Sequence, residues 1–111
     1  LVEEWQRIRR SRGVTAPLAR LGEDLGTALR AGDSAAWGPA AAANYSAGER
    51  LPLLRQPTLV LRPKDEFWDM TARADGLLSE ARRVDLEGQN GGLFDTGAAD
   101  VARYAREFLD R

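Results

Sequence analysis

The sequence predicts an α/β protein with a helical first half and a second half in which strands and helices alternate. Residues 1–50 are rich in alanine and repeat apolar residues at helical spacing. Residues 51–111 instead contain two short apolar runs, each followed by a helical pattern. Strands that alternate with helices are typical of a parallel sheet. We therefore expect a helical segment over residues 1–50 and a strand–helix–strand–helix unit over residues 51–111.

Two helices are expected near the start of the chain. Val2, Trp5 and Ile8 recur at helical spacing, and Gly13 should end that helix. A second helix should begin after Pro17, because leucines then recur along one stripe.

A third helix is expected after the second one ends near Gly32. Asp33 is a suitable N-cap for a helix through Trp37. We expect Gly38-Pro39 to interrupt it.

The second half should form one crossover unit and a covering helix. The apolar run Thr58–Leu61 predicts a strand buried on both faces. Thr71 should cap a helix over residues 72–81, and Val84–Leu86 should form the next strand. Thr96 should cap an amphipathic last helix.

The turn after the second strand is rich in glycine. Gly88, Gly91 and Gly92 do not form a phosphate loop, because no Gly-Lys-Ser/Thr follows them. We expect them to permit positive φ angles instead.

Composition excludes several classes of function. The chain has 16 Lys+Arg and 17 Asp+Glu, which argues against the basic surface of a nucleic-acid-binding protein. No apolar run approaches the roughly 18 residues of a membrane span, and no secretory signal is visible, so we expect a cytoplasmic protein without a membrane partner. Cysteine and histidine are absent, which removes thiol nucleophiles and the commonest general base. The first residue is Leu1 rather than Met, which predicts a fragment or a processed product.

Two segments together resemble the C-terminal end of an α/β-hydrolase. Residues 57–68 read PTLVLRPKDEFW, a strand that leads into a carboxylate loop, and residues 84–96 read VDLEGQNGGLFDT, a strand that leads into a Gly-rich turn. The resemblance covers about residues 45–111 and implies that residues 1–44 correspond to the helical lid of that family. It also implies that Gly91 occupies the position of the catalytic His.

The resemblance leaves two residues as the catalytic acid. Glu66 fits if Pro63 takes the place of the family's loop glycine, and Asp65 fits if the loop is one residue shorter. In a triad this carboxylate would orient the His. The alternative is that Lys64, Asp65, Glu66 and Asp69 form a solvated loop.

No nucleophile is visible. The family's Gly-x-Ser-x-Gly elbow would lie upstream of Leu1, and residues 44–48, NYSAG, lack both its first glycine and its preceding strand. In the hydrolase interpretation Trp37, Trp68 and Phe67 would line an apolar acyl pocket; the alternative is that they pack in the core or lid.

These patterns predict a fragment of a hydrolase-like protein that is inactive by itself. The parent family hydrolyses esters or related acyl bonds of small apolar substrates. The alternative is a noncatalytic module that binds a small ligand or another protein on the same scaffold. We expect no cofactor and no metal. Two strands leave both sheet edges unpaired, which predicts a homo-oligomer, most simply a homodimer, or a missing N-terminal half that completes the sheet.

Overall fold

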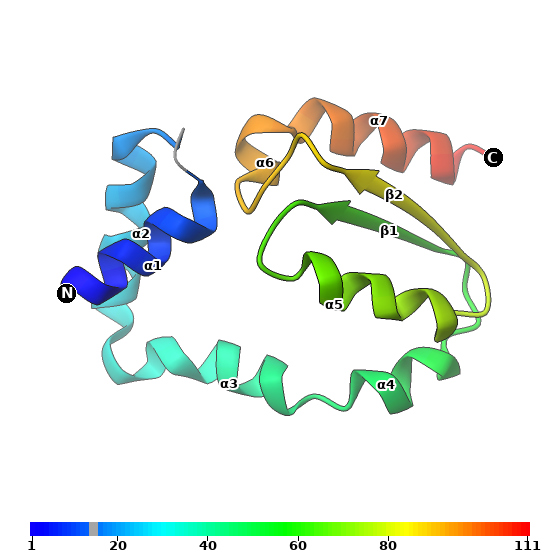
Figure 1. The fold of residues 1–111 in the computed structure, drawn as a ribbon, viewed down its shortest axis with the longest axis horizontal. Helices are drawn as coiled ribbons and strands as arrows, with labels where there is room; N and C mark the ends of the chain where they lie inside the picture. Colours follow the sequence, from blue (N-terminus) through cyan, green and yellow to red (C-terminus); the bar gives the residue numbers. More distant parts are fainter. Residues whose placement is uncertain (14–15) are drawn as a thin grey trace. The chain divides into compact units, whose positions relative to one another are not determined.

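The chain is a mixed α/β protein that is mostly helical and contains a two-stranded parallel sheet (Figure 1). A computed structural model describes residues 1–13 and 16–111. Two compact units are present, Leu1–Ala47 and Gly48–Arg111, so the division follows Ala47 rather than residue 50. Among the described residues, none of the helices has both the length and the apolar character that crossing a membrane requires.

In the first unit, the described residues form helices and no strand. These are α1 (Val2–Arg12), α2 (Leu18–Ala31), the 3-10 helix η1 (Gly32–Ala36) and α3 (Trp37–Asn44). The first two helices are confirmed, including the end of α1 at Gly13, which has a φ of 88°. Such a φ favours glycine because other residues clash there.

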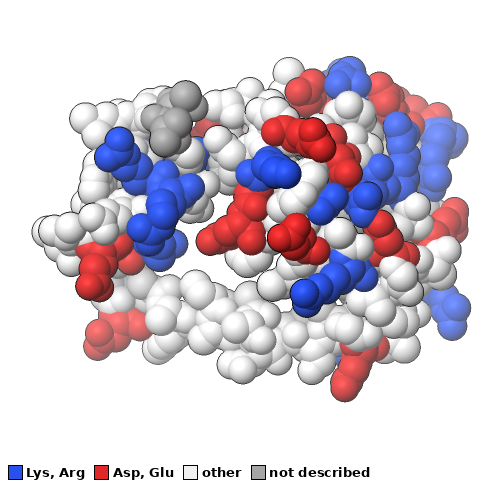
Figure 2. Space-filling view, in the orientation of Figure 1, with Lys and Arg blue, Asp and Glu red and all other residues white. Residues whose placement is uncertain are grey.

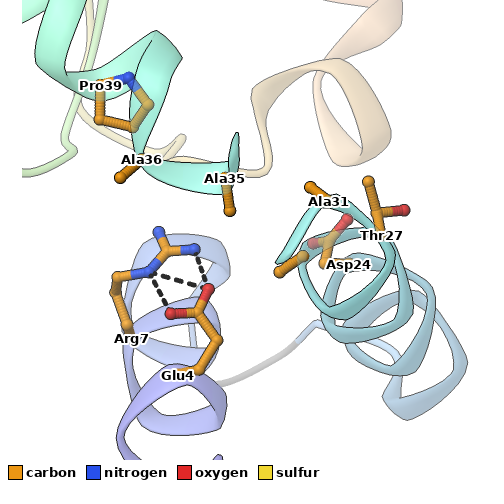
Figure 3. Close-up of a pocket in the computed structure, with 9 residues that line it drawn as sticks. Glu4, Arg7, Asp24, Thr27, Ala31, Ala35, Ala36 and Pro39 are labelled. Atoms are coloured by element: carbon orange, nitrogen blue, oxygen red, sulfur yellow. Dashed lines mark hydrogen bonds and ion pairs between the residues drawn. The ribbon is translucent and has the colours of Figure 1, made fainter. Parts of the chain in front are cut away.

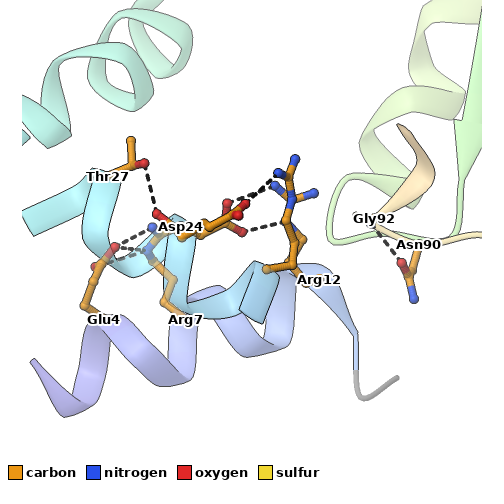
Figure 4. A network of polar contacts seen from close by, with 9 residues as sticks. Glu4, Arg7, Arg12, Asp24, Thr27, Asn90 and Gly92 are labelled. Carbon is orange, nitrogen blue, oxygen red and sulfur yellow. Dashed lines mark hydrogen bonds and ion pairs between the residues drawn. The ribbon is translucent and has the colours of Figure 1, made fainter. Parts of the chain in front are cut away.

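Buried apolar side chains and an ion pair link α1 and α2. Ile8 and Leu21 are each only 4% exposed and form the core of this unit. The Arg12 guanidinium binds Asp24 in a fork, with Nε–Oδ2 at 2.7 Å and Nη2–Oδ1 at 3.1 Å (Figure 4). Two parallel N–H···O bonds of this kind fix the angle between the groups.

The third helix differs from the prediction. Asp33 lies inside η1 and makes no capping hydrogen bond, and α3 runs through Gly38-Pro39. Pro39 is tolerated because it is the third residue of α3, where a backbone N–H has no partner within the helix.

The second unit contains the sheet. After α4 (Ala47–Arg50) and the 3-10 helix η2 (Leu51–Leu53), its elements are β1 (Thr58–Pro63), α5 (Trp68–Ala72), the 3-10 helix η3 (Arg73–Gly76), β2 (Ala81–Leu86), α6 (Leu93–Thr96) and α7 (Ala98–Leu109). The strands are parallel, in a register that runs from Thr58 opposite Ala81 to Pro63 opposite Leu86. Their carboxyl ends therefore meet at one edge of the sheet, next to α6 (Figure 1).

Several element boundaries in this unit were predicted wrongly. The helix expected over residues 72–81 is shorter and earlier, because Ala81 already pairs with Thr58 and the residues after it belong to β2. Thr71 lies inside α5 instead of capping a helix. Thr96 ends α6, where its hydroxyl donates to the Gly92 carbonyl at 3.2 Å; the N-cap of α7 is Gly97.

The burial of β1 was also predicted wrongly. Residues 58–61 are only half-buried, because the faces of a sheet are covered by helices and the helices packed on this small sheet leave part of β1 exposed. The side chains with least exposure in this unit are Leu86 and Leu93, at 8% and 7%, together with Arg62 at 8%.

The Gly-rich turn is not built on positive φ angles. Among the described residues, only Gly13 and Gly32 have positive φ. Side chains hold the turn instead: Asn90 Oδ1 accepts the Gly92 amide at 2.9 Å, as Figure 4 shows. The expectation for Gly88, Gly91 and Gly92 was therefore wrong.

Candidate functional site

The carboxylate loop and the Gly-rich turn lie side by side. The Lys64 amide, just beyond β1, donates to the Gln89 carbonyl, just beyond β2, at 2.8 Å. Both loops leave the carboxyl ends of parallel strands, the edge at which ligands bind in open α/β sheets. The two segments that the resemblance pairs are thus in backbone contact.

The two acid candidates have different surroundings. The Asp65 side chain is engaged locally, since its Oδ1 accepts the Phe67 amide at 2.9 Å. Its carbonyl also accepts the Trp68 amide at 3.2 Å, which starts α5. Glu66 is exposed, and no hydrogen bond or ion pair ties its side chain to the described residues. Asp65 is thus a turn-forming residue, whereas the Glu66 carboxylate is free to accept a new partner.

Gly91 lies exposed at the tip of the turn after β2. The turn around it is ordered by polar contacts: the Gln89 amide donates to the Leu86 carbonyl at 3.0 Å, and the Thr96 hydroxyl donates to Gln89 Oε1 at 3.1 Å. Gly91 is not among the glycines with positive φ, so its backbone does not require glycine for a left-handed conformation.

The sequence did not lead us to expect a functional role for Arg62, a buried cation next to the acid loop. It is 8% exposed, and its guanidinium stacks on the Trp68 ring at 3.6 Å from the centroid. Its Nε donates to the Trp68 carbonyl at 2.8 Å. Lys64 Nζ lies 4.3 Å from the same ring centroid. The sequence did contain a signal for this residue: Arg62 directly follows the apolar run Thr58–Leu61 and lies six residues before Trp68.

A chain of charges continues from Arg62 along the carboxyl half of the sheet. Arg62 Nη1 lies 3.3 Å from Asp85 Oδ2, and Asp85 Oδ1 lies 2.9 Å from Arg83 Nε. Arg83 also pairs with Asp75 from η3. Buried charge is costly unless it is paired, so this network explains how Arg62 is accommodated.

The three predicted pocket aromatics are in different settings. Trp37 belongs to the first unit and is 72% exposed. Phe67 belongs to the second unit and is 51% exposed. Trp68 is half-buried against the cations described above. An acyl pocket formed by these residues stays a prediction.

The first unit contains a pocket of about 590 Å³ (Figure 3). Its wall carries the Glu4–Arg7 ion pair, with Oε1 and Nη2 2.5 Å apart, and this hydrogen bond lowers the pKa of Glu4 below its ordinary value. The rest of the lining is mainly small: Asp24, Thr27, Ala28, Ala31, Ala35, Ala36 and Pro39. None of the predicted site residues lines it.

Charges of both signs are mixed on the surface. Figure 2 shows acidic and basic side chains interspersed over the face that it displays. In the second unit many form ion pairs, such as Arg82 with Glu107 at 3.7 Å and Arg103 with Asp100 at 3.1 Å. Within the described part of the chain, no three acidic side chains converge as a metal site.

No protein-family model matches the chain, and no curated protein or solved structure compared with it matches either.

Proposed function

We propose that this chain corresponds to the lid and C-terminal part of an α/β-hydrolase-like protein in which Gly91 has replaced the catalytic His. Its family would act on esters or related acyl bonds, and this chain by itself is inert. Glu66 is the favoured acid position and Asp65 the second choice. The observation that carries the proposal is the 2.8 Å bond from the Lys64 amide to the Gln89 carbonyl, which joins the acid loop to the turn that holds Gly91.

The chemistry follows from what each position would do. In a triad the acid holds the imidazole in one orientation and stabilises its charged form. Glu66 is exposed and has no partner among the described residues, as expected of an acid whose imidazole is gone. Without an imidazole no group takes the proton of an attacking hydroxyl, a step worth about a hundred- to ten-thousand-fold in rate.

The absence of histidine makes a direct test possible. Gly91→His introduces the only imidazole of the chain, whose protonation NMR can follow without overlap. An isolated imidazole has a pKa of about 6.5, and a carboxylate within about 4–6 Å raises it. We expect the pKa of the new imidazole to lie about one unit above that reference.

Matched variants identify the carboxylate. In the Gly91→His background, Glu66→Gln should return the imidazole pKa to its reference value, whereas Asp65→Asn should leave it raised. Gly88→His is the control in the same turn, at a position with open space around it, and should titrate normally. If the Gly91→His imidazole titrates normally and responds to neither acid, Gly91 is not the vacated position.

The activity itself is tested separately. The unaltered chain should not turn over p-nitrophenyl esters, because it has no His and no Cys. Hydrolysis that persists through purification and scales with the protein would contradict this. In a longer protein that supplies an elbow Ser, Gly91→His should raise ester hydrolysis.

A second candidate is a noncatalytic module that binds a partner. It is favoured by the exposure of every residue from 32 to 50, including Trp37 at 72% and Tyr45 at 60%. The reading frame upstream of Leu1 discriminates the two: a strand followed by Gly-x-Ser-x-Gly and a helix supports the hydrolase-like protein, and its absence supports the module.

A further inference from the structure

The outer edge of β1 presents unpaired backbone groups. In a parallel pair, alternate residues of a strand direct both backbone groups to the neighbouring strand. The Thr58 amide donates to the Glu80 carbonyl at 2.9 Å, so Thr58, Val60 and Arg62 face β2. Leu59 and Leu61 therefore direct their N–H and C=O groups away from β2. Within residues 1–13 and 16–111, no turn, loop or cap bond reaches these groups.

The donor pattern of this edge is two-fold symmetric about Val60. Leu59 and Leu61, one residue to either side, each offer an N–H and a C=O. Pro57 and Pro63, three residues to either side, have no N–H to offer. In a reversed copy, the N–H and C=O groups of Leu59 and Leu61 therefore face matching C=O and N–H groups.

The outer edge of β2 has the opposite character. Its strand carries Arg82, Arg83 and Asp85, all exposed and held in ion pairs. Charged side chains of this kind are how natural sheets protect an edge against pairing. In β1 only Arg62 is charged, and its guanidinium is already engaged by Trp68 and Asp85.

We propose that two copies of this chain associate through β1, antiparallel and centred on Val60. Leu59 of each copy then exchanges both backbone bonds with Leu61 of the second copy, and the prolines end the ladder on both sides. The result is a continuous four-stranded sheet with β2 at each outer edge. An interface of this isologous type closes on itself, so it gives a dimer and not a fibre. The dimer is formed by the 111-residue chain itself and does not require the hydrolase proposal; in a longer protein, a further strand on this edge of β1 would replace the second copy.

Cysteine cross-linking tests the register. The chain has no cysteine, so a single introduced thiol reacts only with its equivalent in a second copy. Across the axis the two Val60 positions form a non-hydrogen-bonded pair with Cα atoms about 4.5 Å apart, within the range of a disulfide. The two Thr58 positions are offset by four residues along the strand, about 14 Å, which is too far.

We expect Val60→Cys to give a covalent dimer under mild oxidation and Thr58→Cys to stay mostly uncross-linked. Equal cross-linking of the two variants would mean random collision or parallel stacking, and it would overturn the proposal. No cross-linking of Val60→Cys would overturn it as well.

Light scattering provides a second test that needs no oxidation. Val60→Lys places two like charges opposite one another at the axis and should weaken the dimer about tenfold or more. Ala81→Lys is the matched control, since it adds the same side chain to the exposed β2 edge and should not change association. A native chain that stays monomeric at high concentration overturns the proposal. If the Leu59 and Leu61 amides of such a monomer are protected from hydrogen exchange, another segment of the same chain pairs with the outer edge of β1.

Discussion

Leu1–Ala47 and Gly48–Arg111 differ in the sequence distance that their stabilising contacts span. In the first unit Glu4–Arg7 and Arg20–Glu23 are one helical turn apart, and an ion pair between its helices, Arg12 with Asp24, spans 12 residues. In the second unit Arg62 binds Asp85 across 23 residues, and the Ser79 hydroxyl reaches the Leu54 carbonyl across 25. The first unit is thus a local structure, and the second depends on contacts that only the folded sheet creates.

This difference matters for function because the candidate site belongs to the nonlocal unit. The acid loop and the Gly91 turn meet only if β1 and β2 pair in the observed register. Any change that loosens the sheet should therefore also separate these loops.

The largest expected effect comes from the small core of the second unit. Leu93→Ala should lower the free energy of unfolding by about 2–3 kcal/mol, since it removes a side chain that is only 7% exposed. It should speed amide exchange in both β1 and β2. Phe94→Ala, one residue along and 77% exposed in the folded chain, should change stability by less than about 0.5 kcal/mol. Equal losses in urea titrations would show that α6 is not packed as described.

Leu21→Ala gives the counterpart in the first unit. The loss should be similar, about 2–3 kcal/mol, because Leu21 is 4% exposed, but faster exchange should be confined to α1 and α2. Leu18→Ala is the control, because Leu18 is 73% exposed in the same helix. Faster exchange in the β strands would contradict the distinction between local and nonlocal units.

The next largest effect is expected from Arg62, whose charged side chain is buried. Arg62→Met removes the hydrogen bond to the Trp68 carbonyl, the contact with the Trp68 ring and the pairing with Asp85, and should cost about 2 kcal/mol. The Trp68 indole NMR signal should shift with it. Arg103→Met removes exposed helical ion pairs and an exposed contact with the Tyr104 ring, and should cost less than about 1 kcal/mol. A cost for Arg62→Met as small as that of the control would mean that the stacked arrangement does not form.

A smaller effect is expected at the junction of α6 and α7. A Cβ on Gly97 would meet Gln89 Cδ at 2.7 Å and Leu93 Cδ1 at 2.9 Å, so Gly97→Ala should cost about 1 kcal/mol. Gly88→Ala in the same turn has open space and should be nearly neutral. Adding Gln89→Ala to Gly97→Ala should recover only part of the lost stability. The Gln89 clash is then removed, but the clash with buried Leu93 remains. Full stability of Gly97→Ala alone would rule out the close approach.

The smallest effect is a pH dependence in the first unit. The hydrogen bond from Arg7 lowers the pKa of Glu4 below its ordinary value of 4.5. A depressed pKa contributes stability that is present above 4.5 and is lost as pH falls through the folded-state value. NMR titration should therefore find the Glu4 pKa below 4.5, and Arg7→Gln should raise it. An unchanged Glu4 pKa in Arg7→Gln would contradict this ion pair.

The first two helices could be predicted from the sequence, because the spacing of apolar residues within each helix decides them. The spacing of Val2, Trp5 and Ile8, with Gly13 after them, correctly placed α1, and the same reasoning placed α2. It failed where distant partners decide: Ala81 has helical propensity, yet it pairs with Thr58 and begins β2.

The candidate site likewise combines features that could be predicted from neighbouring residues with features that depend on residues distant in the sequence. The order of strand, acid loop, strand and Gly-rich turn was visible in the residues, and a parallel pair follows from it. Arg62 was not anticipated, because its partners Trp68 and Asp85 become neighbours only when α5 and β2 are in place. The role of Asn90 in the turn was hidden by the glycines around it.

One measurement tests most directly whether the acid loop and the Gly91 turn are joined. A long-range HNCO experiment on the labelled chain detects scalar coupling through a hydrogen bond from a donor nitrogen to an acceptor carbonyl carbon. We expect a cross-peak between the Lys64 nitrogen and the Gln89 carbonyl, comparable to the one between Thr58 and Glu80 in the sheet. A spectrum that contains the Thr58–Glu80 cross-peak but lacks the Lys64–Gln89 one would show that the two loops are not joined, and the proposed site would be lost.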